Sequence, residues 1–348
     1  MNILGIESSC DETAAAVVLD GRKILSNVVN SQIDIHAVYG GVVPEVAARS
    51  HIEFINPVIN RALTDANMTW DDIDAIAVTY APGLMGSLLV GTLAARALAV
   101  LKHKPLYPIH HVEAHVYANF LNETAPEFPI LALIVSGGHS QLVLFRDHGD
   151  YELLGQTCDD AVGEAFDKVA KILGLPYPGG PSIARAALDG DPLKYKLPKA
   201  KLDGAYDFSF SGLKTAVLRA VQREAGVDIS FPSSGLAARL DASQQNDFAA
   251  SFQRTAIETL VDKTEKAFNN YNPKSVVIAG GVAANQELRR ILSERLPINI
   301  DYAPMNLCTD NAAMVASLGY YQSQTQQPID PFKLEVQPSL SMVKPKTI

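Results

Sequence analysis

The chain has 348 residues, which is too long for one ordinary hydrophobic core and favours two domains. Hydrophobic residues make up 47% of the sequence and charged residues 19%, as in a soluble globular protein. The net charge of −9 argues against a broad nucleic-acid-binding surface, because an acidic protein repels the phosphate backbone at long range.

Secretion and membrane insertion are not expected. The first residues contain no basic segment followed by an apolar one, as a signal peptide would. The longest apolar stretch, residues 88–101, is interrupted by Gly91, Thr92 and Arg96 and is too short to span a membrane. The three cysteines are widely spaced and odd in number, which does not indicate a disulfide framework. We therefore expect a cytoplasmic protein.

The N-terminal region alternates short apolar runs with turns. Strands are expected at residues 2–6, 13–19 and 23–29. Asp20-Gly21, between the last two, is a strong hairpin signal. The elements expected next are a helix near residues 44–64, a strand at residues 75–79 and a helix from about residue 86 to 102.

The turn between the first two strands is unusually polar. Residues 7–13 hold three carboxylates and three hydroxyl groups, although a two-residue turn would connect the strands. Hairpin turns use Ser and Asp for structural reasons as well. We favour a functional role here, as phosphate contact, water positioning or general base.

Two histidines follow the strand-like residues 105–109. His111 and His115 are four residues apart, so on a helix they share one face and can bind one metal ion. Two imidazoles are too few to hold a metal alone, so a third ligand or a ligand phosphate is needed. The alternative is that both histidines cap or pack within the helix. Val112 stands where the peptidase signature H-E-x-x-H has its Glu.

A second cycle of the strand-and-turn pattern starts near residue 130. An apolar strand at residues 130–135 is followed by a small-residue turn at 136–139 and a strand at 141–145. A similar turn, Gly280-Gly281, follows the expected strand at 275–279. Glycine lets a backbone approach a ligand closely, so these turns indicate a nucleotide site. The repetition predicts a duplicated α/β protein with a cleft between its halves.

Three features stay open on the residues alone. Asp310 is the nominated third metal ligand, although Thr309-Asp310-Asn311 also suits a helix N-cap. Asp167, in a helix that begins near Gly163, can bond sugar hydroxyls or pair with a neighbouring lysine. The lysines between residues 194 and 201 form either a local nucleic-acid patch or, more commonly for such runs, a solvated loop.

Taken together, the motifs resemble those of one family. In chain order they are Glu7-Ser8-Ser9-Cys10-Asp11-Glu12-Thr13, Pro82-Gly83-Leu84, His111-x-x-x-His115, Val135-Ser136-Gly137-Gly138-His139, residues 163–168, 178–181, 207–215 and 279–285, and Cys308-Thr309-Asp310-Asn311. They span residue 3 to about residue 317 in the family's order. The sequence is identified as a member of the bacterial TsaD type, the tRNA N6-adenosine threonylcarbamoyltransferases.

The resemblance implies an α/β fold of the actin/Hsp70-like (ASKHA) kind, with two duplicated lobes and a nucleotide cleft. The N-terminal lobe would cover residues 1–128, joined by a C-terminal helix near residues 310–325. The second lobe would cover residues 129–305, and residues 326–348 would form a tail. The implied reaction transfers threonylcarbamoyl from threonylcarbamoyl-AMP to N6 of adenosine 37, in tRNAs that read codons beginning with A.

The resemblance also assigns the site. His111, His115 and Asp310 would bind one Fe²⁺ or Zn²⁺. The adenylate pocket would comprise Ile134, Val135, Ser136, Gly137, Gly138, Asp167, Gly180 and Asn285. Its phosphate or carbamoyl group would lie at the Ser-Gly-Gly turn, the ribose at Asp167 and Gly180, and the adenine at Asn285. Asp11 and Glu12 would face the transferred group as catalytic residues.

The acidic net charge implies that other proteins help to hold the tRNA. The resemblance supplies a TsaB-like paralogue and a TsaE-like ATPase as partners, with a homodimer as a further alternative. The rival functions are an ATP-dependent kinase or ATPase of the same fold and, more remotely, a metallopeptidase. Residues 225–243 look longer than the usual family linker, so the resemblance does not fix their geometry.

Overall fold

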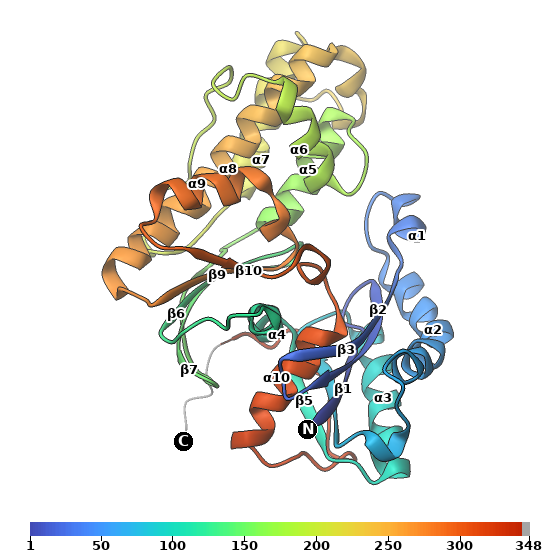
Figure 1. The fold of residues 1–348 in the computed structure, drawn as a ribbon. Helices are drawn as coiled ribbons and strands as arrows, with labels where there is room; N and C mark the ends of the chain where they lie inside the picture. The colour runs from blue at the N-terminus through green and yellow to red at the C-terminus, as the bar shows by residue number, and fades with distance from the viewer. Residues whose placement is uncertain (343–348) are drawn as a thin grey trace. The chain divides into compact units, whose positions relative to one another are not determined.

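The computed structural model describes residues 1–342, which form two compact units (Figure 1). Unit 1 comprises residues 1–127 and 145–151 and the segment from residue 301 onward, and unit 2 comprises residues 128–144 and 152–300. The lobe boundaries expected from the sequence stay a prediction. The expected tail at 326–348 runs past the described part of the chain, since residues 343–348 lie outside it.

The sheet of unit 1 has the strand order β3-β2-β1-β4-β5. Its strands are β1 (Asn2–Glu7), β2 (Glu12–Leu19), β3 (Lys23–Ser31), β4 (Ala75–Ala81) and β5 (Leu106–His110). β2 runs antiparallel to both β1 and β3, whereas β4 runs parallel to β1 and to β5. The expected hairpin is confirmed, because Asp20 and Gly21 both have positive φ (50° and 66°) as a tight two-residue turn requires.

The helices of unit 1 are α1 (Ile33–Ala37), α2 (Pro44–Asp65), α3 (Met85–Lys102), α4 (His111–Tyr117) and α10 (Ala312–Thr325). α2, α3, α4 and α10 pack against the strands of this sheet. α2 and α3 pack against each other and against the core side chains Leu4 and Ile6. Gly5 alternates with these two residues along β1 and therefore faces the other side, where it meets Ala312 of α10.

The exposed side of α3 is largely apolar, and Ile52 of the neighbouring helix α2 is exposed as well. Among the described residues, α3 is the one helix long and apolar enough to cross a membrane, and 33% of it is buried inside the protein. It packs on β4 and α2. Ile52 of α2 and Leu89, Leu93 and Leu101 of α3 stay exposed, and we call these four the α2–α3 apolar side chains.

The second sheet, most of which belongs to unit 2, has the order β10-β9-β6-β7-β8. Its strands are β6 (Ile130–Val135), β7 (Ser140–Asp147), β8 (Asp150–Gln156), β9 (Ser275–Ala279) and β10 (Ile300–Tyr302). The helices of unit 2 are α5 (Val162–Leu173), α6 (Gly179–Ala186), α7 (Ser211–Glu224), α8 (Ala242–Tyr271) and α9 (Gln286–Arg295). β6 and β9 are parallel and buried along their whole length, as strands covered on both faces are.

The two sheets share one plan. In each, the first strand along the chain lies at the centre, with two strands of a hairpin connection on one side and two later strands on the other. The duplicated α/β fold expected from the sequence is thereby confirmed. Between α7 and α8 the chain forms two short 3-10 turns, Ser233–Gly235 and Ala237–Arg239.

Candidate metal centre and nucleotide turns

A short helix presents the two histidines. β5 ends at His110, and α4 begins with His111 directly after it. His110 caps the helix, because its Nδ1 accepts a hydrogen bond from the backbone N–H of Glu113 at 3.4 Å. Its Nε2 donates to the backbone carbonyl of Leu340 at 3.2 Å. His111 and His115 are both buried with ring centroids 4.7 Å apart, so they share one helix face as expected.

Asp310 joins the two histidines. Its Oδ1 lies 3.2 Å from Nε2 of His115 and 3.5 Å from Nε2 of His111. The three residues are the one group of His, Cys, Asp or Glu side chains in the described chain that could hold a metal ion, with ligand atoms within 4.8 Å of one another. The N-cap alternative for Asp310 is wrong, because the side chain that caps α10 is that of Asn311, whose Oδ1 accepts from the backbone N–H of Met314 at 3.1 Å.

The chemistry of this group fits a cation. Two imidazole nitrogens and a carboxylate oxygen are ligands that Zn²⁺ and Fe²⁺ take in proteins. Within the described chain neither ring nitrogen of His115 makes a hydrogen bond, although both are buried. Burying a polar nitrogen without a partner is costly, and a metal ion would satisfy it. Burial lowers the pKa of His111, but Asp310 and Glu7 outweigh it and raise that pKa to about 9, so this pocket attracts positive charge.

Glu7 stands directly behind His111. Its carboxylate is fully buried and lies 3.1 Å from Nδ1 of His111. The backbone N–H of Ser9 and the hydroxyl of Thr79 each donate to it at 2.6 Å. Burial alone would raise the pKa of Glu7, but His111 beside it holds that pKa below its ordinary value.

The acidic turn lies next to Asp310. Burial, with Asp310 and Asp11 nearby, raises the pKa of Glu12 to about 10. Glu12 is therefore protonated at neutral pH while no cation is bound. Asp11 is partly exposed, whereas Glu12 is nearly buried. The structure thus brings the two expected catalytic residues to the same part of unit 1 as the expected metal ligands.

His51 of α2 holds the acidic turn at residues 7–13 through two hydrogen bonds. Its Nε2 donates to the backbone carbonyl of Cys10 at 3.0 Å, and its Nδ1 accepts from the hydroxyl of Thr13 at 2.7 Å. Burial lowers the pKa of His51, which keeps the ring neutral for both bonds. Sequence analysis missed His51, because a single histidine in a helix carries no distinguishing signal. It also missed the special position of Glu7, which was counted only as one of three carboxylates.

In unit 2, the small-residue turn after β6 is open. A side chain added at Gly137 or Gly138 would meet no atom within 4 Å. The hydroxyl of Ser136 instead accepts from the backbone N–H of His139 at 3.1 Å and holds the turn. Ile134 and Val135 are fully buried within β6, so only their backbone can face a ligand. The role of these residues in binding a substrate stays a prediction.

The remaining expected contacts have structural partners as well. Asp167 Oδ1 accepts from the backbone N–H of Gly179 at 2.6 Å, which ties α5 to the first residue of α6. α6 begins at Gly179 within the motif at residues 178–181, and its Gly180 has open space where a side chain would be. Asn285 caps α9 by accepting from the backbone N–H of Leu288 at 3.0 Å. Its side-chain amide donates to Gln253 at 2.9 Å.

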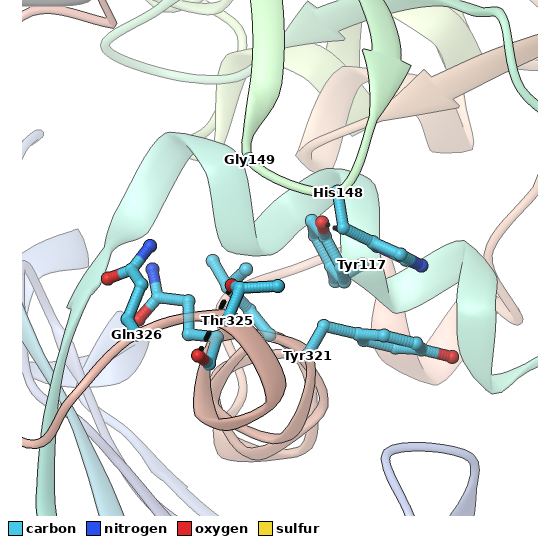
Figure 2. Close-up of a pocket in the computed structure, with 8 residues that line it drawn as sticks. Tyr117, His148, Gly149, Tyr321, Thr325 and Gln326 are labelled. Carbon is cyan, nitrogen blue, oxygen red and sulfur yellow. Dashed lines mark hydrogen bonds between the residues drawn. The ribbon is translucent and has the colours of Figure 1, made fainter.

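An aromatic hollow near the end of α4 is separate from these sites (Figure 2). The ring of His148 stacks on Tyr321 at 4.0 Å, and its Nδ1 lies 2.9 Å from the hydroxyl of Tyr117. The hollow has room for about one water molecule. It is therefore a packing feature of unit 1 rather than a substrate pocket.

Known structures share the fold at low sequence identity. HypF of T. kodakarensis aligns with a TM-score of 0.62 at 15% identity, over 93% of this chain and 48% of that one. Component A of (R)-2-hydroxyglutaryl-CoA dehydratase from Acidaminococcus fermentans aligns with a TM-score of 0.50 at 16% identity, over 94% of this chain and 100% of that one. These likenesses establish the actin/Hsp70-like fold and nothing of the reaction.

Sequence relatives are much closer. The family model described as "TsaD: tRNA N6-adenosine threonylcarbamoyltransferase" matches residues 23–317. A protein of that name from Symbiobacterium thermophilum is 54% identical over 322 residues, which cover 92% of this chain and 91% of the relative. Another, from Dehalococcoides mccartyi, is 53% identical over 344 residues, which cover 98% of this chain and 99% of the relative. The chain therefore belongs to the TsaD family of tRNA N6-adenosine threonylcarbamoyltransferases.

Proposed function

We propose that this chain transfers the threonylcarbamoyl group of threonylcarbamoyl-AMP to N6 of adenosine 37, in tRNAs that read codons beginning with A. The observation that carries the proposal is the identity of more than half the residues with relatives named for this transfer, over nearly the whole chain. The kinase and peptidase alternatives receive no comparable support. The position of the peptidase Glu is held by Val112, which is 1% exposed and lies in the core.

The reaction asks little covalent chemistry of the protein. A carbamoyl–phosphate anhydride is already activated, so the adenine amine can attack its carbonyl carbon and AMP can leave. The protein has to hold the two reactants in line, stabilise the developing charge and receive one proton. A rigid site that presents several polar groups from short turns meets this demand.

We assign one Fe²⁺ or Zn²⁺ per chain to His111, His115 and Asp310. When bound, the ion would supply a Lewis acid for a phosphate or carbonyl oxygen. The three side chains hold it from two directions, the histidines from α4 and the aspartate from the segment before α10. The buried ring nitrogens of His115 make no hydrogen bond in the described chain, and Nε2 lies 3.2 Å from Asp310, which supports this assignment.

Asp11 and Glu12 are our candidates for contact with the transferred group. Glu12 is nearly buried beside Asp11 and close to Asp310, and we assign it contact with the carbonyl of the transferred group. Asp11 is the more exposed of the two, and we assign it the orientation of the attacking amine. If Asp11→Ala and Glu12→Ala both kept the full single-turnover rate, this assignment would be wrong.

We place the adenylate on the turns of unit 2. Its phosphate or carbamoyl group would lie at Ser136-Gly137-Gly138, where the open space at both glycines lets a ligand approach the backbone. The ribose would lie at Asp167 and Gly180, and the adenine at Asn285, with Ile134 and Val135 contributing backbone only. The fixed position of Asn285 as a helix cap supports this, because a preorganised amide loses little entropy on binding.

Partners are expected for the tRNA step. A TsaB-like paralogue and a TsaE-like ATPase are the proposed ones, and a homodimer is the alternative. The α2–α3 apolar side chains support an association, since exposed leucines of this kind are commonly covered in a complex. The net charge of −9 repels the tRNA backbone, which supports a role for partner proteins in binding the tRNA. We place the protein in the cytoplasm, where tRNA and these partners are available.

The test is a transfer assay with purified protein, synthetic threonylcarbamoyl-AMP and unmodified tRNA, with and without the two partners. Digested tRNA is analysed by mass spectrometry for threonylcarbamoyladenosine. His111→Ala should abolish the product. The matched control is His103→Asn, because His103 is an exposed helix-end residue with φ of 52° that asparagine tolerates. Absence of product from the wild type with both partners present would overturn the proposal.

A further inference from the structure

Glu7 is an unusual residue for the end of a buried strand. It is the last residue of β1 and is 0% exposed, although buried carboxylates are rare unless they are paired. Glu7 is not among the metal ligands or substrate-binding residues expected from the sequence. The hydrogen bonds of the Glu7 carboxylate explain why it is tolerated in the core.

The carboxylate is fixed by groups that cannot move far. Oε1 accepts the backbone N–H of Ser9 at 2.6 Å, at the start of the turn that follows β1. Oε2 accepts the hydroxyl of Thr79 at 2.6 Å, from the neighbouring strand β4. Two short bonds to the backbone turn and to the sheet therefore hold Glu7 in one orientation.

The same Oε2 atom lies 3.1 Å from Nδ1 of His111. The opposite nitrogen of that ring, Nε2, is the one that lies 3.5 Å from Asp310. His111 thus has a carboxylate on each side. A histidine that binds a metal through one nitrogen commonly donates the other N–H to a carboxylate, which fixes the ring and its tautomer.

We propose that Glu7 is a positioning residue for the metal centre, holding His111 with its proton on Nδ1 and its lone pair on Nε2. The inference rests on the proposed metal site. It distinguishes the two histidines: Glu7 orients His111 through Nδ1, whereas His115 makes no hydrogen bond in the described chain and faces Asp310 with its Nε2 at 3.2 Å.

Nδ1 of His111 has a second neighbour that competes with Glu7. The hydroxyl of Ser9 also lies 3.1 Å from Nδ1 of His111. An ionised carboxylate is the stronger acceptor for an N–H group, and Ser9 can rotate its hydroxyl elsewhere. Glu7 is therefore assigned the orienting role, and the Ser9→Ala variant tests the alternative.

The experiment measures Zn²⁺ affinity of the full chain by competition with a chromophoric chelator, together with the visible spectrum of the Co²⁺ form. Glu7→Gln should weaken Zn²⁺ binding by about 10–100-fold and change the Co²⁺ bands, the usual effect of losing such a partner. Glu7→Asp should recover part of the affinity, because it keeps the charge. Ser9→Ala should change the affinity by less than about threefold, well below the effect of a lost carboxylate.

Glu113→Gln is the matched control. Glu113 is a second buried carboxylate and lies between the two histidines on α4. Because it is two residues from each of them along the helix, its side chain lies on the opposite face from theirs. Zn²⁺ affinity of Glu7→Gln equal to the wild type, or equal loss in Glu113→Gln, would overturn the inference. So would a fall in Ser9→Ala as large as in Glu7→Gln. A melting temperature for each variant separates a misfolded protein from a weak site.

The same titrations separate an error in the metal site from an error in the role of Glu7. If wild type and His111→Ala bind Zn²⁺ equally, the metal centre itself is wrong and the role of Glu7 is refuted with it. If His111→Ala loses Zn²⁺ but Glu7→Gln does not, the metal centre stands and only the positioning role is refuted.

Discussion

Replacing Gly5 with alanine should displace the helix that follows Asp310. Gly5 lies in the middle of β1, and a side-chain methyl there would come within 2.3 Å of the carbonyl oxygen of Ala312 and 2.7 Å of the backbone nitrogen of Ala316. Both atoms belong to the first turns of α10. Because they are backbone atoms, no side-chain rotation relieves the contact, and the helix has to move.

The size of the effect follows from the geometry. Overpacking a well-filled core costs about 1–3 kcal/mol, and a clash with two backbone atoms places Gly5→Ala at about the upper end. For a unit of this size, about 3 kcal/mol lowers the melting temperature by about 6–12 °C. Movement of α10 also carries Asp310 away from the histidines, so Zn²⁺ affinity should fall together with stability.

Differential scanning calorimetry and Zn²⁺ titration measure both effects. Gly212→Ala in α7 is the control, because a methyl group there would meet no atom within 4 Å, and alanine is the better helix former. A Gly5→Ala protein that melts and binds Zn²⁺ like the wild type would show that β1 and α10 are not packed backbone to backbone as described.

Three other outcomes are expected. Chelation of the metal should lower the melting temperature, because an ion at a hundredfold excess over its dissociation constant stabilises by about 2.7 kcal/mol; calorimetry with and without chelator measures this. Asn285→Ala should lose the cap of α9 and about 1 kcal/mol of stability, whereas Asn285→Asp should keep the cap. A fall in nucleotide affinity of Asn285→Asp would then measure the contribution of the side-chain amide without the loss of the cap. Gly83→Ala should slow transfer without lowering Zn²⁺ affinity in proportion, because its methyl would come within 2.6 Å of the carbonyl oxygen of Ser9 in the acidic turn; single-turnover kinetics would detect this.

The local parts of the fold were predictable because short-range signals determine them. The hairpin after β2 follows from Asp20-Gly21, where positive φ angles are needed and tolerated. The helical face shared by His111 and His115 follows from their spacing alone. The repeated strand-and-turn pattern likewise predicted two similar sheets, which both have the first strand at the centre.

The long-range parts were not predictable from the same signals. Asp310 is 195 residues from His115 in the chain, and nothing in the composition of Thr309-Asp310-Asn311 separates a ligand from a helix cap. The structure separates them, because Asn311 provides the cap and Asp310 lies beside the histidines. The residues alone nominated Asp310 without excluding a cap, and only the resemblance to a family favoured the ligand. The burial of Glu7 was missed for a similar reason: the strand was expected to end at Ile6, which would have left Glu7 in a solvated turn.

The order of the strands explains why distant motifs meet in unit 1. β1, β4 and β5 are parallel neighbours, so their C-terminal ends lie along one edge of the sheet. Each is followed at once by a motif: the acidic turn after β1, Pro82-Gly83 after β4, and His111 after β5. The backbone N–H of Leu84 donates to the carbonyl of Ser9 at 2.8 Å and ties the first two motifs together.

The same rule applies within unit 2. β6 and β9 are parallel neighbours, and the turns after them hold Ser136 and Gly280. A side chain at Gly280 would meet the carbonyl oxygen of Val135 at 2.4 Å, so glycine is what allows the two turns to approach. A duplicated sheet therefore provides two edges at which turns gather. In unit 1 that edge became acidic and histidine-rich, which suits a cation, and in unit 2 it became glycine-rich, which suits a phosphate. Sequence differences confined to the turns thus give the two edges of one repeated scaffold different chemical character.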